Sequence, residues 1–486
     1  MKKLFLLFLI VPFLCIGSCS SDDSSDLKVS LDKTSLTLTV GRTDKLTATV
    51  SPADATNKAI TWSTSNSSIA TVSAGTVTAV AEGTATITVT SRADSTKTAQ
   101  CAVTVNPRPV TDIGAKDGLS GKTATAYFTE KNVNIGWNLG NAFDAGPGEG
   151  SWTKPVIKEL LVGVKDAGFS AIRIPITWNG TNRPIGAAPD YKLDQTELNR
   201  VAEVVDWAYD AGLVTIINIH HDGSTSGWLS ITKARQSTEN RNNITAQFKK
   251  VWEQLADKFK NYGDWLIFEP FNEVQNGGWG WGDIQDVEFD IINDWNKVFT
   301  ETVRAAGGKN TERFLIVQPY CAKPHQAISD KFILPTDTAT GKQIVSIHYY
   351  DPENFALNGT SYEWGTDDHK GNLTQGSGQI PGFVAFKEKF TSKGIPVILG
   401  ECGATYQAAR TGAERVTADA SRLVYLDYMC RQAKANGMIP VVWDNGNITG
   451  QASRPNGEAF GLFDRNTGEP FTEMKLVIDT MINAVQ

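Results

Sequence analysis

Two hydrophobic patterns divide the chain. From residue 27 to residue 106, short runs alternate apolar and polar residues, and Gly, Pro, Asn and Asp stand between the runs. Examples are SLTLTV (35–40), KLTATV (45–50), AITWST (59–64), GTVTAV (75–80) and GTATITVTS (83–91). Many short strands at near-regular spacing are typical of a β-sandwich, so we predict an all-β sandwich here, with Trp62 in its core.

Beyond residue 122, apolar runs alternate with helix-like stretches. The runs that read as buried strands are VNIGWNL (133–139), AIRIPITW (171–178), VTIINIH (214–220), WLIFEPF (265–271), RFLIVQPY (313–320), IVSIHYY (344–350), PVILGE (396–401) and IPVVWDN (439–445). Helices are predicted over 194–211, 244–260, 288–306 and 417–436, with Gly437 ending the last. This order predicts an α/β fold, a (β/α)8 TIM barrel over 122–486. A doubly wound open sheet is the alternative, but GWNLGN has the wrong spacing for its phosphate loop.

The N-terminus reads as an export signal. Lys2 and Lys3 precede an apolar run (4–16) that is too short for a transmembrane helix, so residues 1–18 are predicted to be a signal peptide. The run closes in Ile16-Gly17-Ser18-Cys19, which resembles a bacterial lipobox and implies lipidation of Cys19; an ordinary signal peptide is the alternative. The acidic, serine-rich tether (19–26) resembles that of Bacteroidetes-type surface lipoproteins. We therefore expect an outer-membrane lipoprotein at the bacterial cell surface.

Composition excludes several classes of function. A net charge of −7 and a pI near 5.4 leave no basic field for nucleic acid. Outside the leader, Cys101, Cys321, Cys402 and Cys430 are too few for a disulfide framework in a chain of this length. Five histidines without a Cys/His cluster predict no metal, and no cofactor is implied. We expect a monomer, with a proline-rich linker over 107–121.

Polar residues follow the predicted barrel strands where an active site would lie. In a TIM barrel the active site is at the carboxyl ends of the strands. The residues at those ends are Asn138, Asn141, Arg173, His220, His221, Asp222, Asn272, Glu273, His348, Tyr350, Glu401 and Trp443. Two facing carboxylates suit glycoside cleavage, one as proton donor and the other as nucleophile or base. Arg173 would keep one acid ionised, and the acid in the drier setting would be the proton donor.

The motifs RIPITW, NIHH, FEPFNE, HYY, LGE and VVWDNG, in this order, resemble those of glycoside hydrolase family 5, which are retaining β-glycanases on (β/α)8 barrels. The resemblance implies Glu273 as acid/base and Glu401 as nucleophile. Further hallmark positions are matched by Arg173, His220, Asn272, His348, Tyr350 and Trp443, and Asn138 and His221 are expected in the same cleft. GWNLGNAFDA and HYYDP look most like subfamily 4, which contains endoglucanases, xyloglucanases and mixed-linkage glucanases. Residues 60–90 resemble a bacterial immunoglobulin-like domain of group 2.

Other residues receive supporting roles. Trp178, Trp228, Trp279 and Trp281 lie in loops after strands, where aromatic rings stack on sugars, and 277–283 is expected to form a cleft wall. Glu269 shares a strand face with Glu273 but lies deeper, so we expect a buried structural carboxylate paired with a cation. Asp222 and Asp351 are expected to fix loops through hydrogen bonds.

The leading hypothesis is a retaining endo-β-1,4-glucanase acting on a polysaccharide such as β-glucan or xyloglucan. A mannanase or xylanase on the same barrel is the nearest alternative, and transglycosylation would use the same intermediate. A non-catalytic, glycan-binding lipoprotein is the alternative from another class, but it would need neither Glu273 nor Glu401. The immunoglobulin-like segment is expected to act as a spacer, or else as a weak glycan-binding module.

Overall fold

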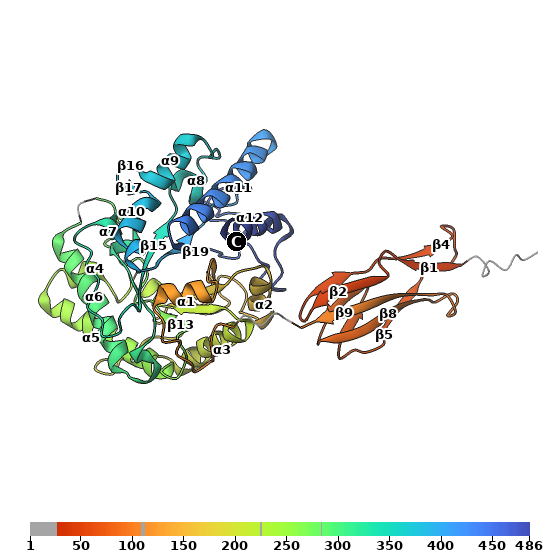
Figure 1. The fold of residues 1–486 in the computed structure, drawn as a ribbon, viewed down its shortest axis with the longest axis horizontal. Helices are drawn as coiled ribbons and strands as arrows, with labels where there is room; N and C mark the ends of the chain where they lie inside the picture. Colours follow the sequence, from red (N-terminus) through yellow and green to blue (C-terminus); the bar gives the residue numbers. More distant parts are fainter. Residues whose placement is uncertain (1–26, 108–111, 224–225, 283) are drawn as a thin grey trace, which may run out of the picture. The chain divides into compact units, whose positions relative to one another are not determined.

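The computed structural model describes residues 27–107, 112–223, 226–282 and 284–486. The chain forms two compact units that divide between Pro109 and Val110 (Figure 1). The predicted signal peptide (1–18), the tether (19–26) and Cys19 lie outside the described residues, as does the 108–111 part of the expected linker. No described helix is both long and apolar enough to span a bilayer.

The N-terminal unit is built of strands. A four-stranded sheet has the order β2 (Ser35–Thr39), β9 (Thr98–Asn106), β8 (Gly83–Ser91), β5 (Ile60–Thr64). A second sheet has the order β3 (Thr43–Lys45), β7 (Thr76–Ala79), β6 (Ala70–Ser73), and β1 (Lys28–Leu31) pairs with β4 (Ala48–Ser51). Alternate residues of β8 and β9 face a core that includes Ile87, Cys101 and Val103. Trp62 packs against this core, as predicted, although it lies at the edge and remains partly exposed.

The second unit is the predicted TIM barrel. Eight parallel strands close on themselves in chain order. They are β10 (Gly136–Asn138), β11 (Ala171–Ile174), β12 (Val214–Ile217), β13 (Leu266–Phe268), β14 (Leu315–Val317), β15 (Gln343–Tyr349), β18 (Val397–Cys402) and β19 (Met438–Val442). Most are shorter than predicted, since the polar residues that follow them belong to loops. In β13, for example, only three residues are paired, and Asn272 and Glu273 lie beyond the strand.

Helices surround the barrel strands (Figure 1). They are α1 (Ala124–Glu130), α2 (Lys158–Asp166), α3 (Gln195–Ala211), α4 (Ile231–Ala234), α5 (Thr238–Lys258), α6 (Asp286–Ala305), α7 (Pro324–Ile328), α8 (Glu353–Ala356), α9 (Asp367–Gln375), α10 (Phe383–Lys389), α11 (Gly412–Ala435) and α12 (Lys475–Val485). Short 3-10 turns are η1 (His221–Gly223), η2 (Gly308–Thr311), η3 (Tyr320–Ala322), η4 (Thr391–Lys393) and η5 (Thr472–Met474), and β16 (Gly376–Ser377) forms a hairpin with β17 (Ile380–Pro381).

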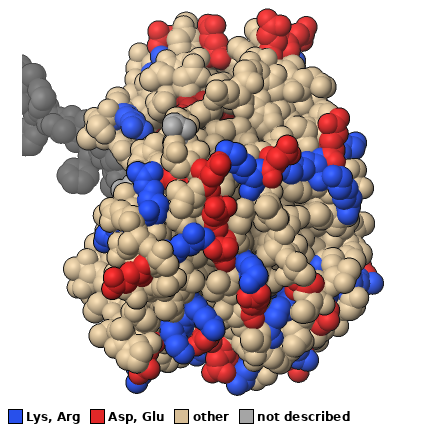
Figure 2. All heavy atoms as spheres, turned by 90° about the vertical axis from the view of Figure 1, so that its left-hand side faces the viewer, with Lys and Arg blue, Asp and Glu red and all other residues tan. Residues whose placement is uncertain are grey.

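Side-chain caps decide where the predicted helices begin and end. Asp194 accepts from the Glu197 backbone N–H at the start of α3. Ser237 caps α5 through the backbone N–H of Asn240, so that α5 starts before the predicted residue 244. After α11, Gly437 adopts a left-handed φ of 71°, which confirms its predicted place just beyond the helix. On the face drawn in Figure 2, basic and acidic side chains are interspersed.

Arg313 ties the loop before β13 to β14. Its side chain is fully buried, and its guanidinium donates to the Asn310 side chain and to four backbone carbonyls. These carbonyls belong to Phe259, Tyr262, Gly263 and Leu266, at 2.7 to 3.0 Å. Burial lowers the pKa of Arg313 to about 9. The cation is therefore held by backbone dipoles, and removing it would take a charged donor from each of those carbonyls, of which Phe259 and Gly263 keep a backbone donor.

We predict that Arg313→Met lowers the free energy of unfolding of the barrel by at least about 3 kcal/mol, since it removes several hydrogen bonds from a charged donor, each of which contributes roughly 1.5–3 kcal/mol. Denaturant unfolding followed by tryptophan fluorescence measures this, because every Trp except Trp62 lies in the barrel. Arg431→Met is the control, since Arg431 is about half exposed and makes only a surface ion pair with Asp427. Equal unfolding midpoints for the two variants would refute this structural role.

Candidate active site

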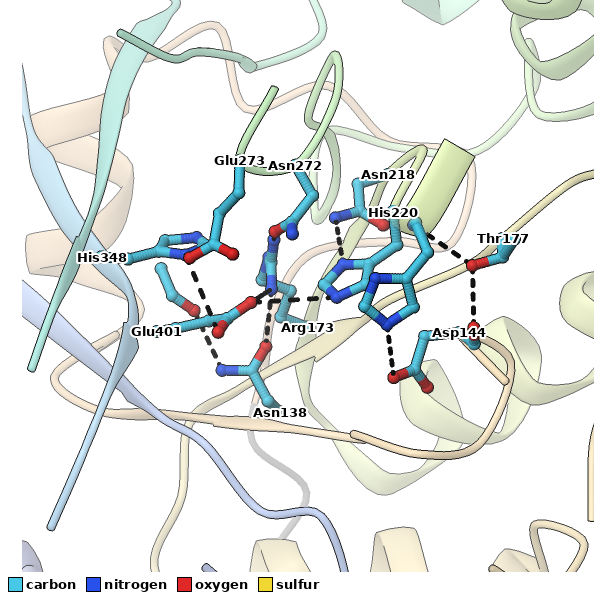
Figure 3. Close-up of polar contacts among 12 residues, drawn as sticks. Asn138, Asp144, Arg173, Thr177, Asn218, His220, Asn272, Glu273, His348 and Glu401 are labelled. Atoms are coloured by element: carbon cyan, nitrogen blue, oxygen red, sulfur yellow. Dashed lines mark hydrogen bonds and ion pairs between the residues drawn. The ribbon is translucent and has the colours of Figure 1, made fainter. Parts of the chain in front are cut away.

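A buried arginine organises the mouth of the barrel (Figure 3). Arg173, in β11, has no exposed surface and donates through every nitrogen of its guanidinium. Nε donates to Glu269 at 2.6 Å, Nη2 to Asn272 at 2.6 Å, and Nη1 to both Asn138 and Glu401 at 3.0 Å. One planar group thereby fixes four polar side chains from the ends of three strands, β10, β13 and β18.

Glu269 is the buried structural carboxylate that the sequence predicts. Besides Arg173 it accepts hydrogen bonds from Asn218 (2.9 Å) and Gln318 (2.8 Å), and it has no exposed surface. All three donors hold its charge in place. It lies below the mouth and has no route to a substrate.

Asn138 was predicted to bind substrate, and the structure does not support this. Its side chain is fully buried, its amide N–H group donates to the Gly400 and Val441 carbonyls, and its oxygen accepts from Arg173. With this hydrogen-bonding capacity used inside the barrel, Asn138 positions Arg173 and does not face the cleft.

Both candidate acids lie next to the same ring nitrogen of His348. Glu401 is in β18 and His348 in β15, and these neighbouring strands pair the two residues in register. His348 Nδ1 is 2.6 Å from Glu273 Oε1 and 3.7 Å from Glu401 Oε2. The Tyr350 hydroxyl donates to Glu401 Oε2 at 3.2 Å. One oxygen of each acid and a ring nitrogen of His348 all lie within 4.8 Å of one another.

Glu273 reaches this position through a strained backbone. Its φ of 42° is in the left-handed region, which L-residues with a side chain seldom adopt and which costs about 1–3 kcal/mol. Cys321 and Ala322, in the neighbouring η3 turn, also have positive φ, and the Cys321 N–H donates to the carbonyl of Val274. The strain turns the Glu273 carboxylate toward His348 and the cleft.

The electrostatics differ from the sequence-based expectation. Burial raises the pKa of Glu401, and the charge of Glu273 adds to this, while His348 and Arg173 oppose it. Burial also acts to raise the pKa of Glu273, but the adjoining His348 outweighs it and lowers that pKa. Glu401 is the drier acid, with 9% of its side chain exposed against 26% for Glu273. Glu401, the nucleophile that the family resemblance implies, is therefore the less exposed acid, whereas the sequence-based expectation placed the proton donor in the drier setting.

His220 has a fixed tautomer. The Asn218 side-chain oxygen accepts from the Ile176 N–H and its amide group donates to Glu269, so the same amide must donate to His220 Nδ1 at 3.2 Å. His220 Nε2 then carries the proton and points toward Glu401 Oε1, 4.0 Å away. Burial lowers the pKa of His220 well below its usual value. The ring is stacked parallel to that of Trp443, with centroids 6.0 Å apart.

This tautomer also bears on metal binding. Asp144, His220 and His221 offer three ligand atoms within 4.8 Å, a set that suits a transition metal. His220 Nδ1 already accepts a hydrogen bond and Nε2 carries the proton, so His220 presents no free lone pair. The set therefore does not fit a metal without breaking the Asn218 network. The other such group within the described ranges is Glu273, His348 and Glu401, in which His348 Nδ1 already contacts Glu273 at 2.6 Å.

His221 leads to two residues that sequence reasoning missed. Its side chain is 43% exposed, and its Nε2 lies 3.8 Å from Asp144 Oδ2. The ring of Trp152, itself half exposed, lies 5.8 Å from that of His221. Burial raises the pKa of Asp144 to about 7. The sequence did contain a signal for Trp152, because a tryptophan among Gly and Ser in the loop after a predicted barrel strand is a candidate for stacking on a sugar.

The predicted sugar-binding tryptophans differ in their environments. Trp178 is buried and donates to the Asn218 carbonyl, so it belongs to the core. Trp228 donates to Asp222, whose carboxylate also accepts from the Trp178 and Asn179 backbones, which confirms Asp222 as a loop-fixing residue. Trp281 stacks on His325 at 4.4 Å, so one of its faces is covered. Trp279 is 59% exposed and free to receive a sugar.

Comparisons with known proteins agree with this geometry. Residues 130–448 match the family described as Cellulase (glycosyl hydrolase family 5), and residues 28–103 match the Bacterial Ig-like domain (group 2). The chain is 35% identical to Endoglucanase B of Clostridium cellulovorans over 72% of this chain and 74% of that protein. It is 30% identical to a xyloglucan-specific endo-beta-1,4-glucanase of Bacteroides ovatus over 73% of this chain and 70% of the relative.

A solved structure is similar as well. A GH5-4 broad specificity endoglucanase from Bacteroides salanitronis, 36% identical, superposes with a TM-score of 0.67 over 76% of this chain and 97% of its own. The family match covers well over half of the chain, and it spans all eight barrel strands with the residues at their ends. The chain therefore belongs to the cellulase family, glycosyl hydrolase family 5.

Proposed function

We propose that the barrel is a retaining endo-β-1,4-glucanase with Glu401 as nucleophile and Glu273 as acid/base. The observation that carries this proposal is the separation of the two acids, whose nearest oxygens lie within 4.8 Å. Retaining glycosidases place their carboxyl groups about 5–5.5 Å apart, whereas inverting enzymes leave about 6.5–9.5 Å for a water molecule. This separation therefore favours direct attack of one acid on the anomeric carbon over attack by a water molecule held between the acids.

In the first step a Glu401 oxygen attacks the anomeric carbon and forms an ester, while the glycosidic C–O bond breaks. Glu273 gives its proton to the leaving oxygen. In the second step Glu273 takes a proton from water, the water oxygen attacks the anomeric carbon, and the ester to Glu401 breaks. Each step conserves atoms and charge within the acid pair, the sugar and one water.

His348 positions Glu273 for proton transfer. Its Nδ1 lies 2.6 Å from Glu273 Oε1, so the ring holds the carboxyl group at the cleft. This contact also favours the ionised form of Glu273 and so lowers its pKa, which suits the second step, in which Glu273 takes a proton from water. Tyr350 and Arg173 hold Glu401 in its ionised, attacking form by donating one hydrogen bond to each of its oxygens.

A β-1,4-glucan backbone is the substrate we propose, because the relatives above are an endoglucanase, a broad specificity endoglucanase and a xyloglucan-specific enzyme. Trp443, Trp279 and Trp152 supply aromatic surface at the barrel mouth, where sugar rings stack. Reducing-end assays on barley glucan, carboxymethylcellulose, xyloglucan, mannan and xylan test this. Fastest hydrolysis of mannan or xylan would overturn the glucanase proposal in favour of the alternative.

We predict that Glu273→Ala and Glu401→Ala differ in their response to the leaving group. Both should lose about 10²–10⁴-fold or more of their activity on polysaccharide. With a dinitrophenyl cellobioside, whose leaving group needs no proton, Glu273→Ala should still form the glycosyl-enzyme, whereas Glu401→Ala should not. Burst kinetics of dinitrophenol release measure this. A burst from Glu401→Ala would reverse the two roles.

The acid limb of the kcat/KM pH profile should lie above 4.5, the ordinary pKa of a glutamic acid, because Glu401 must be ionised to attack and burial raises its pKa. Tyr350→Phe removes a donor to the ionised form, so the limb should move up by about one pH unit. Tyr362→Phe, at a tyrosine outside the acid pair's contacts, is the control. An unchanged acid limb in Tyr350→Phe would contradict this role of Tyr350.

We further propose that Cys19 is lipidated and anchors the enzyme at the outer surface of a bacterium, with the immunoglobulin-like domain as a spacer. The lipobox-like Ile16-Gly17-Ser18-Cys19 and the acidic tether support this. Metabolic labelling with a palmitate analogue should mark the wild type and leave Cys19→Ser unlabelled. An unlabelled wild type would refute the anchor.

A further inference from the structure

A cavity lies next to the end of β15, the strand that carries His348. It has a volume of about 250 Å³ and lies among α8, α9 and the β16–β17 hairpin, in the upper part of Figure 1. Its inner wall is formed by Tyr349 and Asp351, and Phe355 and Trp364 supply aromatic surface. Neither acid of the catalytic pair lines it. Tyr350, which contacts Glu401, lies in sequence between two of its wall residues.

The inner wall carries polar groups that the protein leaves unbonded. Tyr349 is 1% exposed and Asp351 8%, yet the Tyr349 hydroxyl and the Asp351 carboxylate have no hydrogen-bond partner within the described part of the chain. Asp351 was predicted to fix a loop through its side chain; only its backbone carbonyl is bonded, by Tyr425. Burial raises the pKa of Asp351 to about 6, although Lys323 acts against it. The oxygens of both side chains still have accessible surface in the cavity, so an occupant of the cavity would supply the hydrogen bonds that the protein does not.

The rim of the cavity is polar, like its inner wall. The side chains of Asn354, Asn372 and Glu363 line the cavity, and none of them forms a hydrogen bond with another described residue. No Lys or Arg is among the lining residues, whereas two carboxylates are, so an anionic ligand is disfavoured. The cavity thus combines acceptors, amides, a phenolic hydroxyl and aromatic carbon.

We propose that this cavity binds a single neutral sugar ring. Sugar hydroxyls both donate and accept, which suits a wall of carboxylates, amides and a phenol, and the C–H face of a pyranose packs on aromatic carbon. The volume is below the usual range of about 300–1,000 Å³ for drug-sized ligands and suits one ring. The ring is either a branch unit of a decorated glucan or a free monosaccharide. The choice of sugar as ligand rests on the proposed function.

A sugar bound in the cavity would influence the catalytic centre through one residue, Tyr350. Tyr349 and Asp351 flank Tyr350 on the chain, and Tyr350 donates to Glu401. A sugar bonded to both flanking side chains would restrain the end of β15 and the loop that follows. Filling the cavity would therefore bear on the attacking acid without contact to it.

Calorimetry on the full chain with glucose, xylose and a xyloglucan heptasaccharide tests the proposal. We expect wild type to bind at least one of them with a dissociation constant in the millimolar range. Asn372→Phe, which places a ring at the exposed rim, and Asp351→Ala, which removes the inner acceptor, should weaken this binding at least tenfold. Gln375→Phe, on the same helix but outside the cavity wall, is the matched control and should bind as wild type.

Kinetics separate the two sources of the ring. If the cavity takes a branch unit, Asn372→Phe should raise KM for xyloglucan and leave KM for barley glucan unchanged. If it takes a free monosaccharide, free sugar should bind and both KM values should stay as in wild type.

Absence of sugar binding in wild type, or equal binding by wild type, Asn372→Phe and Asp351→Ala, would overturn the proposal. A wild type that binds sugar but hydrolyses no β-glycan would instead count against the proposed function alone.

Discussion

The site depends on one guanidinium shared between two carboxylates. Arg173 donates to Glu269 inside the barrel and to Glu401 at its mouth. A fully buried cation needs such partners, since removing either would leave an uncompensated charge. The deeper carboxylate is held by three donors and has no exposed surface, so it fixes the arginine, and the arginine fixes the catalytic acid. Because Arg173 also pairs with Glu269, it stabilises the ionised form of Glu401 less than an undivided charge would, and the pKa of Glu401 remains raised.

His348 bears on proton transfer through its contact with Glu273. The short contact from His348 holds the Glu273 carboxyl group in place, while the Tyr350 hydroxyl donates a hydrogen bond to Glu401. The left-handed backbone of Glu273 is the strain that makes this contact possible.

Much of this could be predicted from the sequence, because it follows from local periodicity and from position along strands. Eight apolar runs predict the eight strands, and the two-residue repeat of a strand places Glu269 on the same face as Glu273 but deeper. What could not be predicted depends on distant partners. The direction of the pKa of Glu401 depends on how Arg173 divides its charge, and the buried Asn138 depends on carbonyls of two other strands. The pocket beside Tyr350 is made by a segment without a clear helix or strand period, so no pattern indicated it.

The central claim is that Glu401 attacks the sugar directly. A 2-deoxy-2-fluoro cellobioside with a good leaving group forms the glycosyl-enzyme quickly and hydrolyses it slowly, so mass spectrometry of the trapped protein and of its peptides locates the ester. The account predicts one sugar per chain, attached to Glu401 in the peptide that contains PVILGE. A label on Glu273, or normal turnover with inversion at the anomeric carbon and no trapped species, would contradict it.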